Sequence, residues 1–367
     1  MAAGRDAGSD SLKRDGAITF NEIRQQPELW PTTLERVASS NVRSLVRNRS
    51  AVICGAGTSA YAAAAVAATW SNSVAIPTTD LLTFSGRELA HLVPAFVSNG
   101  VLVSLARSGE SPESVAVIAR IKQMFPSVVH LAITCNEQGQ LARLSGANAI
   151  VLDPRTNDRS LVMTGSFSNL LLAGMAIAHG EFLAKHLPGI AAAVGDAFPR
   201  FLKVAQRLAS LSASRLLVLT SAGLVPLARE ATLKVLEMTA GRTVVLSETF
   251  LGVRHGPMSF LRPDSLVLCV LSAAVERRRF EEDVIRELRQ KKLGHVVVVG
   301  TADANSELGD DFVPAMAPDL PDDFRVPFEI VFPQLLAYEL SLASHLDPDN
   351  PSPDGVITRV VQRFQLH

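Results

Sequence analysis

The sequence is poor in aromatic residues and in cysteines, and both shortages narrow the fold class. Phe, Trp and Tyr make up only 5% of the 367 residues, although hydrophobic residues make up 47%. The apolar residues are mainly Ala, Val and Leu, which suit helices covering parallel strands better than a β-sandwich. The three cysteines, Cys54, Cys135 and Cys269, lie far apart in apolar stretches. We therefore expect buried thiols in a reducing compartment, without a disulfide framework or a metal site.

The sequence also lacks an excess of charge of one sign. A formal net charge of -1 gives no field that would attract nucleic acid or anionic lipid. The polar segment Met1–Arg14 has no apolar core of a secretory signal, and the Ala-rich stretch Tyr61–Thr69 is too short to span a bilayer. We expect a cytoplasmic protein with a small-molecule partner, no nucleic-acid or membrane partner, and a disordered arm over residues 1–18.

The length and the rhythm of the chain predict two α/β domains. A chain of 367 residues exceeds the size at which one hydrophobic core stops growing. Apolar strands alternate with small-residue turns and amphipathic helices, the pattern of parallel βαβ units, and the rhythm restarts near residue 213. We predict a helical segment over 19–48, a first domain over 49–194, a connector helix over 195–212, a second domain over 213–346 and a tail over 347–367. Each domain is expected to hold a five-stranded parallel sheet flanked by helices, in a flavodoxin-like three-layer sandwich.

Individual elements follow from the same patterns. The expected strands are Ala51–Cys54, Ser73–Pro77, Val101–Leu105, Val128–Ile133 and Ala149–Leu152, then Arg215–Thr220, Thr243–Leu246, Ser265–Leu271 and His295–Val299. Thr19 and Glu22 have the spacing of a capping box that would start the first helix, and a second helix is expected over Thr33–Val46. Three prolines within Asp347–Gly355 indicate an exposed tail.

The turn after the first expected strand is typical of a phosphate site. In Gly55-Ala56-Gly57-Thr58-Ser59-Ala60, glycines would let backbone N–H groups approach an anion at the start of a helix. The same residues satisfy G-x-G-x-x-A, and Asp80 follows at the end of the next strand. A dinucleotide site is therefore an alternative, and so is a purely structural turn.

A second turn, Ala106-Arg107-Ser108-Gly109-Glu110-Ser111-Pro112, favours a monophosphate. Hydroxyls, backbone N–H groups and one arginine at a helix start form a compact cradle for a phosphate, and Pro112 suits the first turn of the helix. A dinucleotide fold needs no second hydroxyl-rich turn beside the first. The alternatives are that Ser108 and Ser111 only cap the helix, and that Arg107 pairs with an acidic surface residue.

Two further segments of the second half contain candidate residues for proton transfer. Glu230, Lys234 and Glu237 have i, i+4 and i+7 spacing and therefore share one helix face. A solvated ion-pair face is the alternative, but apolar neighbours favour a carboxylate with a raised pKa that could carry a proton. His255 precedes Gly256-Pro257, which breaks a helix, and its imidazole suits proton delivery to a sugar ring oxygen. A structural role for His255 is the alternative.

Taken together, these motifs resemble the sugar-isomerase (SIS) domain family, and within it the AgaS-type galactosamine-6-phosphate deaminase/isomerases, also called tagatose-6-phosphate ketose/aldose isomerases. The resemblance runs nearly end to end. It rests on Glu22-Ile23-Arg24 with Gln26-Pro27, Gly55–Ala60, Pro77–Leu81, Arg107–Ser114, Ile133–Glu137, Asp158-Arg159, Met163-Thr164, Ala228–Glu230, Leu233–Glu237, Arg254–Pro257, Asn350-Pro351 and Arg359-Val360-Val361.

The resemblance implies roles for particular residues. The residues expected to bind the substrate, mainly at its phosphate, are Gly57, Thr58, Ser59, Arg107, Ser108, Gly109, Ser111 and Thr164, although the family's sugar-synthesising branch has Gln where Arg107 stands. By similarity to the isomerase domain of glucosamine-6-phosphate synthase, Glu237 matches the base at C1 and C2 and His255 the residue that opens the ring, while Lys234 matches a helix lysine. That synthase carries a Schiff-base lysine near its C-terminus, whereas residues 359–367 contain none.

The resemblance therefore predicts an isomerase without a cofactor, which deaminates galactosamine 6-phosphate to tagatose 6-phosphate and ammonia by proton transfer between C1 and C2. The alternatives are a non-catalytic phosphosugar sensor, a glucosamine-6-phosphate deaminase-type enzyme and a dinucleotide oxidoreductase. The substrate class is a hexose or hexosamine 6-phosphate, and a homodimer or homotetramer is expected. We also expect Ser59 and Ser108 to lie close together, because strands one and three of such a sheet can end side by side.

Overall fold

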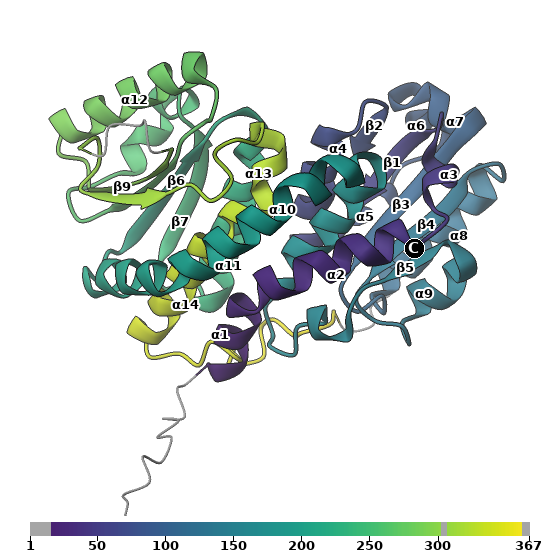
Figure 1. The fold of residues 1–367 in the computed structure, drawn as a ribbon, viewed down its shortest axis with the longest axis horizontal. Coiled ribbons are helices and arrows are strands. Elements are labelled where there is room, and N and C mark those ends of the chain that lie inside the picture. The colour runs from purple at the N-terminus through teal and green to yellow at the C-terminus, as the bar shows by residue number, and fades with distance from the viewer. Residues whose placement is uncertain (1–15, 302–306, 362–367) are drawn as a thin grey trace, which may run out of the picture.

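The computed structural model describes residues 16–301 and 307–361, and it contains two parallel five-stranded sheets. Figure 1 shows the two sheets at opposite ends of the molecule, with long helices between them. The first sheet consists of β1 (Ser50–Cys54), β2 (Ser73–Ala75), β3 (Gly100–Ala106), β4 (Val129–Thr134) and β5 (Ala149–Val151). The second consists of β6 (Arg215–Thr220), β7 (Val244–Thr249), β8 (Leu266–Val270), β9 (His295–Gly300) and β10 (Asp311–Pro314). The predicted fold class is confirmed.

The two sheets have the same topology. Their strand orders are β2-β1-β3-β4-β5 and β10-β9-β8-β6-β7, so β6 corresponds to β1 and β8 corresponds to β3. Every residue of the two strands β3 and β8 is buried, as expected for apolar strands that helices cover on both faces. The repeat that the sequence indicates is therefore a repeat of topology.

Helices cover both sheets. The first domain carries α4 (Thr58–Thr69), α5 (Thr78–Leu81), α6 (Gly86–Leu92), α7 (Pro94–Asn99), α8 (Pro112–Met124) and α9 (Gln140–Ser145). The second carries α11 (Val225–Met238), α12 (Val275–Gln290), α13 (Asp322–Glu329) and α14 (Val331–Ala343). The three buried cysteines are free thiols, as expected.

The N-terminal helices differ from the prediction. The first, α1 (Ala17–Arg24), is the short helix that was expected to start at Thr19, whereas α2 (Gln26–Ala38) and α3 (Arg43–Val46) stand where one helix over Thr33–Val46 was expected. The capping box was also wrong, because α1 begins before Thr19. The Thr19 hydroxyl donates 2.9 Å to the Pro348 carbonyl, and the Glu22 carboxylate accepts from the Ser160 N–H at 3.3 Å. Both side chains make long-range contacts instead of capping the helix. Residues 1–15 of the expected arm lie outside the described residues.

One long helix crosses the predicted boundary between the first domain and the connector. It is α10 (Gly165–Ser210), 46 residues long and kinked at His179, where φ is -126° and ψ is 27°. Its composition would allow it to cross a bilayer, but 67% of its most apolar window is buried in the protein, as in a core helix. Together with α2, α4, α11 and α14 it builds one hydrophobic core that draws residues from both domains. This shared core fixes α11 of the second domain against α4 of the first.

Candidate active site

A cavity lies where α4, α11 and the C-terminal tail meet. Its volume is about 660 Å³. The lining includes Gly57, Thr58 and Arg107 from the first domain and Glu237 from the second. The remaining lining residues are Ala56, Leu161, Met163, Gly355, Val356, Ile357, Thr358, Arg359 and Val361. Residues that the sequence assigns to phosphate binding and to proton transfer thus face the same space.

The turn after β1 has the backbone that its glycines permit. Gly57 has φ of +56°, and no atom lies within 4 Å of a Cβ placed there. At Gly55 a Cβ would lie 2.4 Å from the Ser59 backbone, so a larger residue would push the turn away from α4. The buried Thr58 hydroxyl donates to Glu230 Oε1 at 3.3 Å. The turn is therefore tied directly to the second domain.

Three charged residues of α11 form a buried chain that ends at the cavity. The Lys234 ammonium is 0% exposed, lies 3.6 Å from Glu230 Oε1, and donates to Glu237 Oε2. The Glu230 side chain is also 0% exposed, whereas the Glu237 side chain is 23% exposed. The predicted shared helix face is confirmed, and the solvated ion-pair alternative is wrong for Glu230 and Lys234.

The environment sets the charges of this chain. Burial raises the pKa of Glu230 to about 8, against the opposing effect of Lys234. Burial by itself lowers the pKa of Lys234, but Glu230 and Glu237 together raise it above its usual value. The Lys234 side chain therefore stays an ammonium group and pairs with the Glu237 carboxylate. A charged, fully buried ammonium is no nucleophile, so Lys234 acts as a positioning residue for Glu237.

The chain is similar to curated proteins over nearly its whole length. It is 31% identical to the D-galactosamine-6-phosphate deaminase AgaS of Escherichia coli, with 96% of each chain covered. It is 32% identical to the D-galactosamine-6-phosphate deaminase AgaS of Shewanella sp. (strain ANA-3), with 98% of this chain and 94% of the relative covered. The chain belongs to the AgaS family. No protein-family model matches it.

Solved structures agree with this membership. A tagatose-6-phosphate ketose/aldose isomerase from Escherichia coli superposes with a TM-score of 0.81 at 28% identity, over 94% of this chain and 96% of that one. The C-terminal domain of a glucosamine-fructose-6-phosphate aminotransferase from Francisella tularensis superposes with a TM-score of 0.75 at 17% identity, over 94% of this chain and all of that one. The second likeness concerns the fold alone.

Membership of the AgaS family removes the basis for a dinucleotide site, and Asp80 is exposed in α5.

Arg107 contacts the protein in a way that the sequence did not predict. Its Nη1 donates to the carbonyls of Ser160, Leu161 and Val162 at 3.2–3.3 Å, and its Nη2 donates to the Arg359 carbonyl. Burial lowers the pKa of this guanidinium below its usual value. The alternative of a surface ion pair is wrong, because all of these acceptors are main-chain carbonyls. In this AgaS-family chain Arg107 connects the wall of the cavity to the C-terminal tail.

Several other predicted binding residues lie outside the cavity lining described for residues 16–301 and 307–361. They are Ser59, Ser108, Gly109, Ser111 and Thr164. Ser108 Oγ accepts from the Glu110 N–H at 3.3 Å and Ser111 Oγ lies 2.7 Å from Ser114 Oγ, so both hydroxyls bind within their own turn. The Thr164 N–H donates to Asp158 Oδ2 at 2.8 Å. β1 and β3 are adjacent parallel strands, as expected, while the closeness of Ser59 and Ser108 stays a prediction.

His255 also stands apart from this cavity within the single chain. It ends a short 3₁₀ turn, Gly252–His255, and it is exposed. The structure confirms that His255 is in no α-helix, and its role in ring opening stays a prediction.

The tail is the part of the site that sequence reasoning missed. Residues 355–361 supply much of the lining. Of the segment Asp347–Gly355, which was expected to be exposed, Pro353, Asp354 and Gly355 are exposed but Pro348, Pro351 and Ser352 are buried. Arg359 donates from Nε to the Asp158 carbonyl at 3.0 Å and from Nη2 to Asn157 Oδ1 at 2.9 Å, which fixes the tail over the first domain. The Arg359-Val360-Val361 match to the family was the available signal, but no role followed from it. Residues 362–367 lie outside the described residues.

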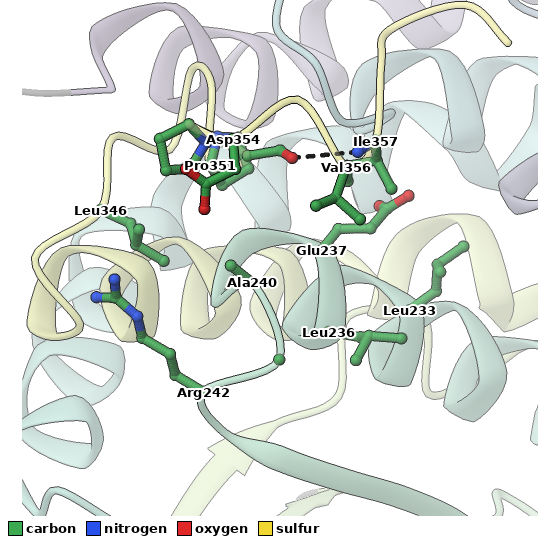
Figure 2. A pocket seen from close by; sticks show the side chains of 13 residues that line it. Leu233, Leu236, Glu237, Ala240, Arg242, Leu346, Pro351, Asp354, Val356 and Ile357 are labelled. Carbon is green, nitrogen blue, oxygen red and sulfur yellow. Dashed lines mark hydrogen bonds between the residues drawn. The ribbon is translucent and has the colours of Figure 1, made fainter.

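A second cavity adjoins the first on the other side of Glu237. Its volume is about 490 Å³, and Glu237, Val356 and Ile357 line both cavities. Figure 2 shows Glu237 reaching from α11 toward the tail, where the Ile357 N–H donates to Ser352 Oγ at 3.1 Å. The side chain of Glu237 therefore lies between the two cavities.

Proposed function

We propose that this chain is a cytoplasmic phosphosugar enzyme that converts galactosamine 6-phosphate and water to tagatose 6-phosphate and ammonia. The observation that carries the proposal is the partly exposed Glu237 carboxylate, which faces the cavity beside the Gly57-Thr58 turn and is held by a fully buried lysine. The AgaS relatives, named as D-galactosamine-6-phosphate deaminases over their full length, support the same reaction.

The reaction needs one base that can reach two neighbouring carbons. With the sugar ring open, Glu237 removes the proton from C2, and the electron pair forms a C1–C2 double bond while the C1 carbonyl oxygen takes up a proton. Return of a proton to C1 leaves a C2 imine. Water adds to C2, the C2–N bond breaks, and ammonia leaves with the ketose as the product. A carboxylate fixed by Lys234 supplies the orientation that such a proton shuttle requires.

The substrate handle is the phosphate. The Gly57-Thr58 turn presents the backbone at the start of α4, where an anion is stabilised by free N–H groups and by the helix dipole. Arg107 contributes positive charge at the edge of the same cavity while its N–H groups bind carbonyls. We assign phosphate binding first to the turn and only second to Arg107.

The decisive experiment is a product assay over a substrate panel. Ammonia and ketose 6-phosphate release would be measured with galactosamine, glucosamine and their N-acetylated 6-phosphates. Release of both products in equal amounts from galactosamine 6-phosphate, with the smallest KM, supports the proposal. Faster turnover of glucosamine 6-phosphate would assign the glucosamine-type alternative. Binding of all four without ammonia or isomer formation would identify a phosphosugar sensor.

We further propose a homodimer or homotetramer, in which His255 of a neighbouring subunit completes the site. The support is that His255 lies outside the cavity of its own chain, although ring opening needs an acid near the sugar. Mixing Glu237→Gln and His255→Asn proteins tests this. Recovered activity in mixed oligomers, when neither variant alone is active, supports shared sites. Full activity of a monomer at micromolar concentration in ultracentrifugation would contradict them.

A further inference from the structure

The second domain has two turns that correspond to the turns predicted to bind phosphate in the first domain. Because β6 corresponds to β1 and β8 to β3, the turns after β6 and β8 correspond to the two turns that the sequence assigns to phosphate binding. These turns are Ser221-Ala222-Gly223 and Leu271-Ser272-Ala273-Ala274, and the second leads into the long helix α12. Ligands bind to parallel sheets at the carboxyl ends of the strands. The groups that lie at this edge of the second sheet therefore indicate what it could bind.

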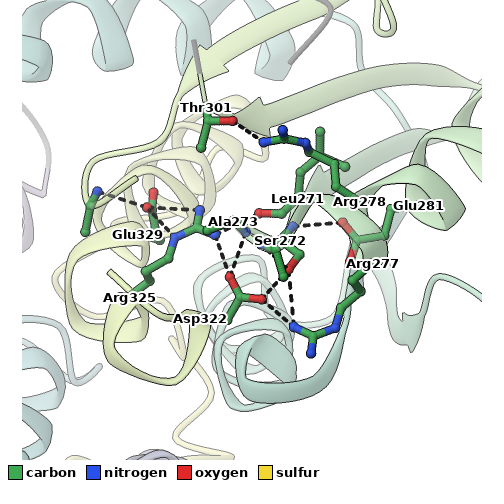
Figure 3. Close-up of polar contacts among 12 residues, drawn as sticks. Leu271, Ser272, Ala273, Arg277, Arg278, Glu281, Thr301, Asp322, Arg325 and Glu329 are labelled. Atoms are coloured by element: carbon green, nitrogen blue, oxygen red, sulfur yellow. Dashed lines mark hydrogen bonds and ion pairs between the residues drawn. The ribbon is translucent and has the colours of Figure 1, made fainter. Parts of the chain in front are cut away.

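A carboxylate of the chain itself occupies this edge. Asp322, the first residue of α13, accepts hydrogen bonds from four donors. Oδ1 accepts from the Ala273 N–H at 2.9 Å and from Arg325 Nη1 at 2.9 Å, whereas Oδ2 accepts from Arg277 Nη1 at 2.6 Å and from the Ser272 hydroxyl. Figure 3 shows these groups converging on the carboxylate. Each oxygen has two donors, and the side chain is only 5% exposed.

The donors are those that bind phosphate monoesters. They are one hydroxyl, one backbone N–H just before a helix, and two guanidinium groups. Ser272 corresponds in topology to Ser108, since each is the second residue after β8 and β3 respectively. Although burial raises the pKa of Asp322, the hydrogen bonds from Ser272, Ala273 and Arg325 lower it overall, so the group is charged at neutral pH.

The first turn of α13 also occupies the space beside the turn after β6. A Cβ at Gly223 would lie 1.6 Å from Asp323 Oδ1 and 2.8 Å from the Asp323 nitrogen. Glycine is therefore needed at this position to let α13 approach. The first turn of α13 thus contacts both of these turns, whereas Gly57, Thr58 and Arg107 of the corresponding turns in the first domain line the open cavity.

We propose that the second domain contains a phosphate-type anion site which the Asp322 carboxylate occupies in place of a ligand. The chain consequently presents one open phosphate edge instead of two, and α13 is held on the second domain by the contacts that would otherwise bind an anion. Removal of the carboxylate should expose a site for inorganic phosphate or for the phosphate of a sugar ester.

The test is phosphate binding to Asp322→Ala in the full-length protein. Radiolabelled inorganic phosphate would be counted by equilibrium dialysis, and the melting temperature would be followed as phosphate is added. The variant should bind one more phosphate per chain than wild type does. With phosphate at about five times its dissociation constant, it should gain roughly 1–2 °C more in melting temperature than wild type gains. Asp319→Ala is the matched control, because it removes the same charge from an exposed position three residues earlier.

Each outcome decides the matter. An additional phosphate and a larger melting shift in Asp322→Ala, with Asp319→Ala resembling wild type, support the proposal. A folded Asp322→Ala protein that binds no additional phosphate overturns it. If Asp322→Ala does not fold, Asp322→Ser, which keeps a helix-capping oxygen, takes its place. Failure of both variants to fold in phosphate buffer, when Asp319→Ala folds, also overturns it, because phosphate then cannot replace the carboxylate. The comparison with wild type makes the result independent of the reaction that the first cavity catalyses.

Discussion

Two helices of the second domain, α11 and α13, each hold a buried cation between two acidic side chains, yet only one of the two arrangements is open to a cavity. On α11 Lys234 lies between Glu230 and Glu237, and on α13 Arg325 lies between Asp322 and Glu329. Glu237 is 23% exposed toward the cavity, whereas Asp322 and Glu329 are 5% and 2% exposed. The backbone N–H groups of Met316 and Ala317 also donate to Glu329. On α11 one carboxylate, Glu237, stays accessible and can react. On α13 the carboxylate oxygens of Asp322 and Glu329 all accept hydrogen bonds, which hold this helix in place.

The largest expected effect is that of Glu237→Gln on turnover. The amide keeps the size of the side chain but cannot take a proton, and general acid–base groups contribute about 10²–10⁴-fold to rate. We expect at least a 100-fold fall in kcat with little change in KM, because the phosphate handle is untouched. Exchange of the C2 proton with deuterated water should be lost with it. Glu248→Gln is the control, and retention of more than about a tenth of the exchange in Glu237→Gln would point to Glu248 as the base instead.

The next prediction separates the two buried cations. Removing one partner of a buried ion pair costs about 3–5 kcal/mol, so Arg325→Met and Lys234→Met should both lower the free energy of unfolding by about this amount. Only Lys234→Met should also lower kcat per folded molecule, since Arg325 lies in the closed edge. Urea unfolding and kinetics on the folded fraction measure both quantities. An equal loss of kcat in Arg325→Met would show that the closed edge is coupled to catalysis.

The stability of the protein should also depend on pH through Glu22, which contacts the first domain at Ser160. Burial, and then the charge of Asp158, raise the pKa of Glu22 from 4.5 to about 7, so the folded protein holds a proton that the unfolded chain releases. Stability from this group is therefore complete below pH 4.5 and is lost as the pH rises to about 7, by at most about 3 kcal/mol. The difference in unfolding free energy between wild type and Glu22→Gln should fall over this range. A constant difference would contradict the assignment.

The smallest predicted effect concerns the contact between the domains at Thr58. Thr58→Val removes the hydroxyl that donates to Glu230, and a hydrogen bond of this kind contributes about 1 kcal/mol. We expect a loss of that size in urea unfolding. Thr83→Val, at an exposed position, is the control and should change stability by less than about 0.5 kcal/mol.

Strands and the charged face of α11 could be predicted because their signals are local. Arg215–Thr220 was placed with both ends correct, since a continuous apolar run between turn residues identifies a buried strand. The i, i+4 and i+7 spacing placed Glu230, Lys234 and Glu237 together for the same reason. Nothing local shows that Lys234 would be fully buried, because the groups that cover it come from distant elements.

The roles that were missed depend on contacts between distant segments. Arg107 was assigned to phosphate from its neighbours in the turn, but its carbonyl partners lie more than 50 residues away, and Arg359 lies 252 residues away. The prolines of Asp347–Gly355 indicated an exposed segment, but Pro348 and Pro351 are buried against the rest of the chain. Thr19 and Glu22 have capping-box spacing, yet their partners are Pro348 and Ser160. Spacing rules apply to residues within a few positions of one another. They do not predict contacts with residues that are distant in the sequence and adjacent only in the fold.

The long, kinked helix α10 has a consequence for any attempt to divide the protein. The topology repeats, but the helix runs from the first domain into the second and its buried face belongs to a core that both share. A half-chain that ends near residue 194 would leave the apolar surfaces of α4 and α10 without α11 and α14 to cover them. Such a half-chain, expressed alone, should therefore aggregate or associate with a second copy that covers these surfaces.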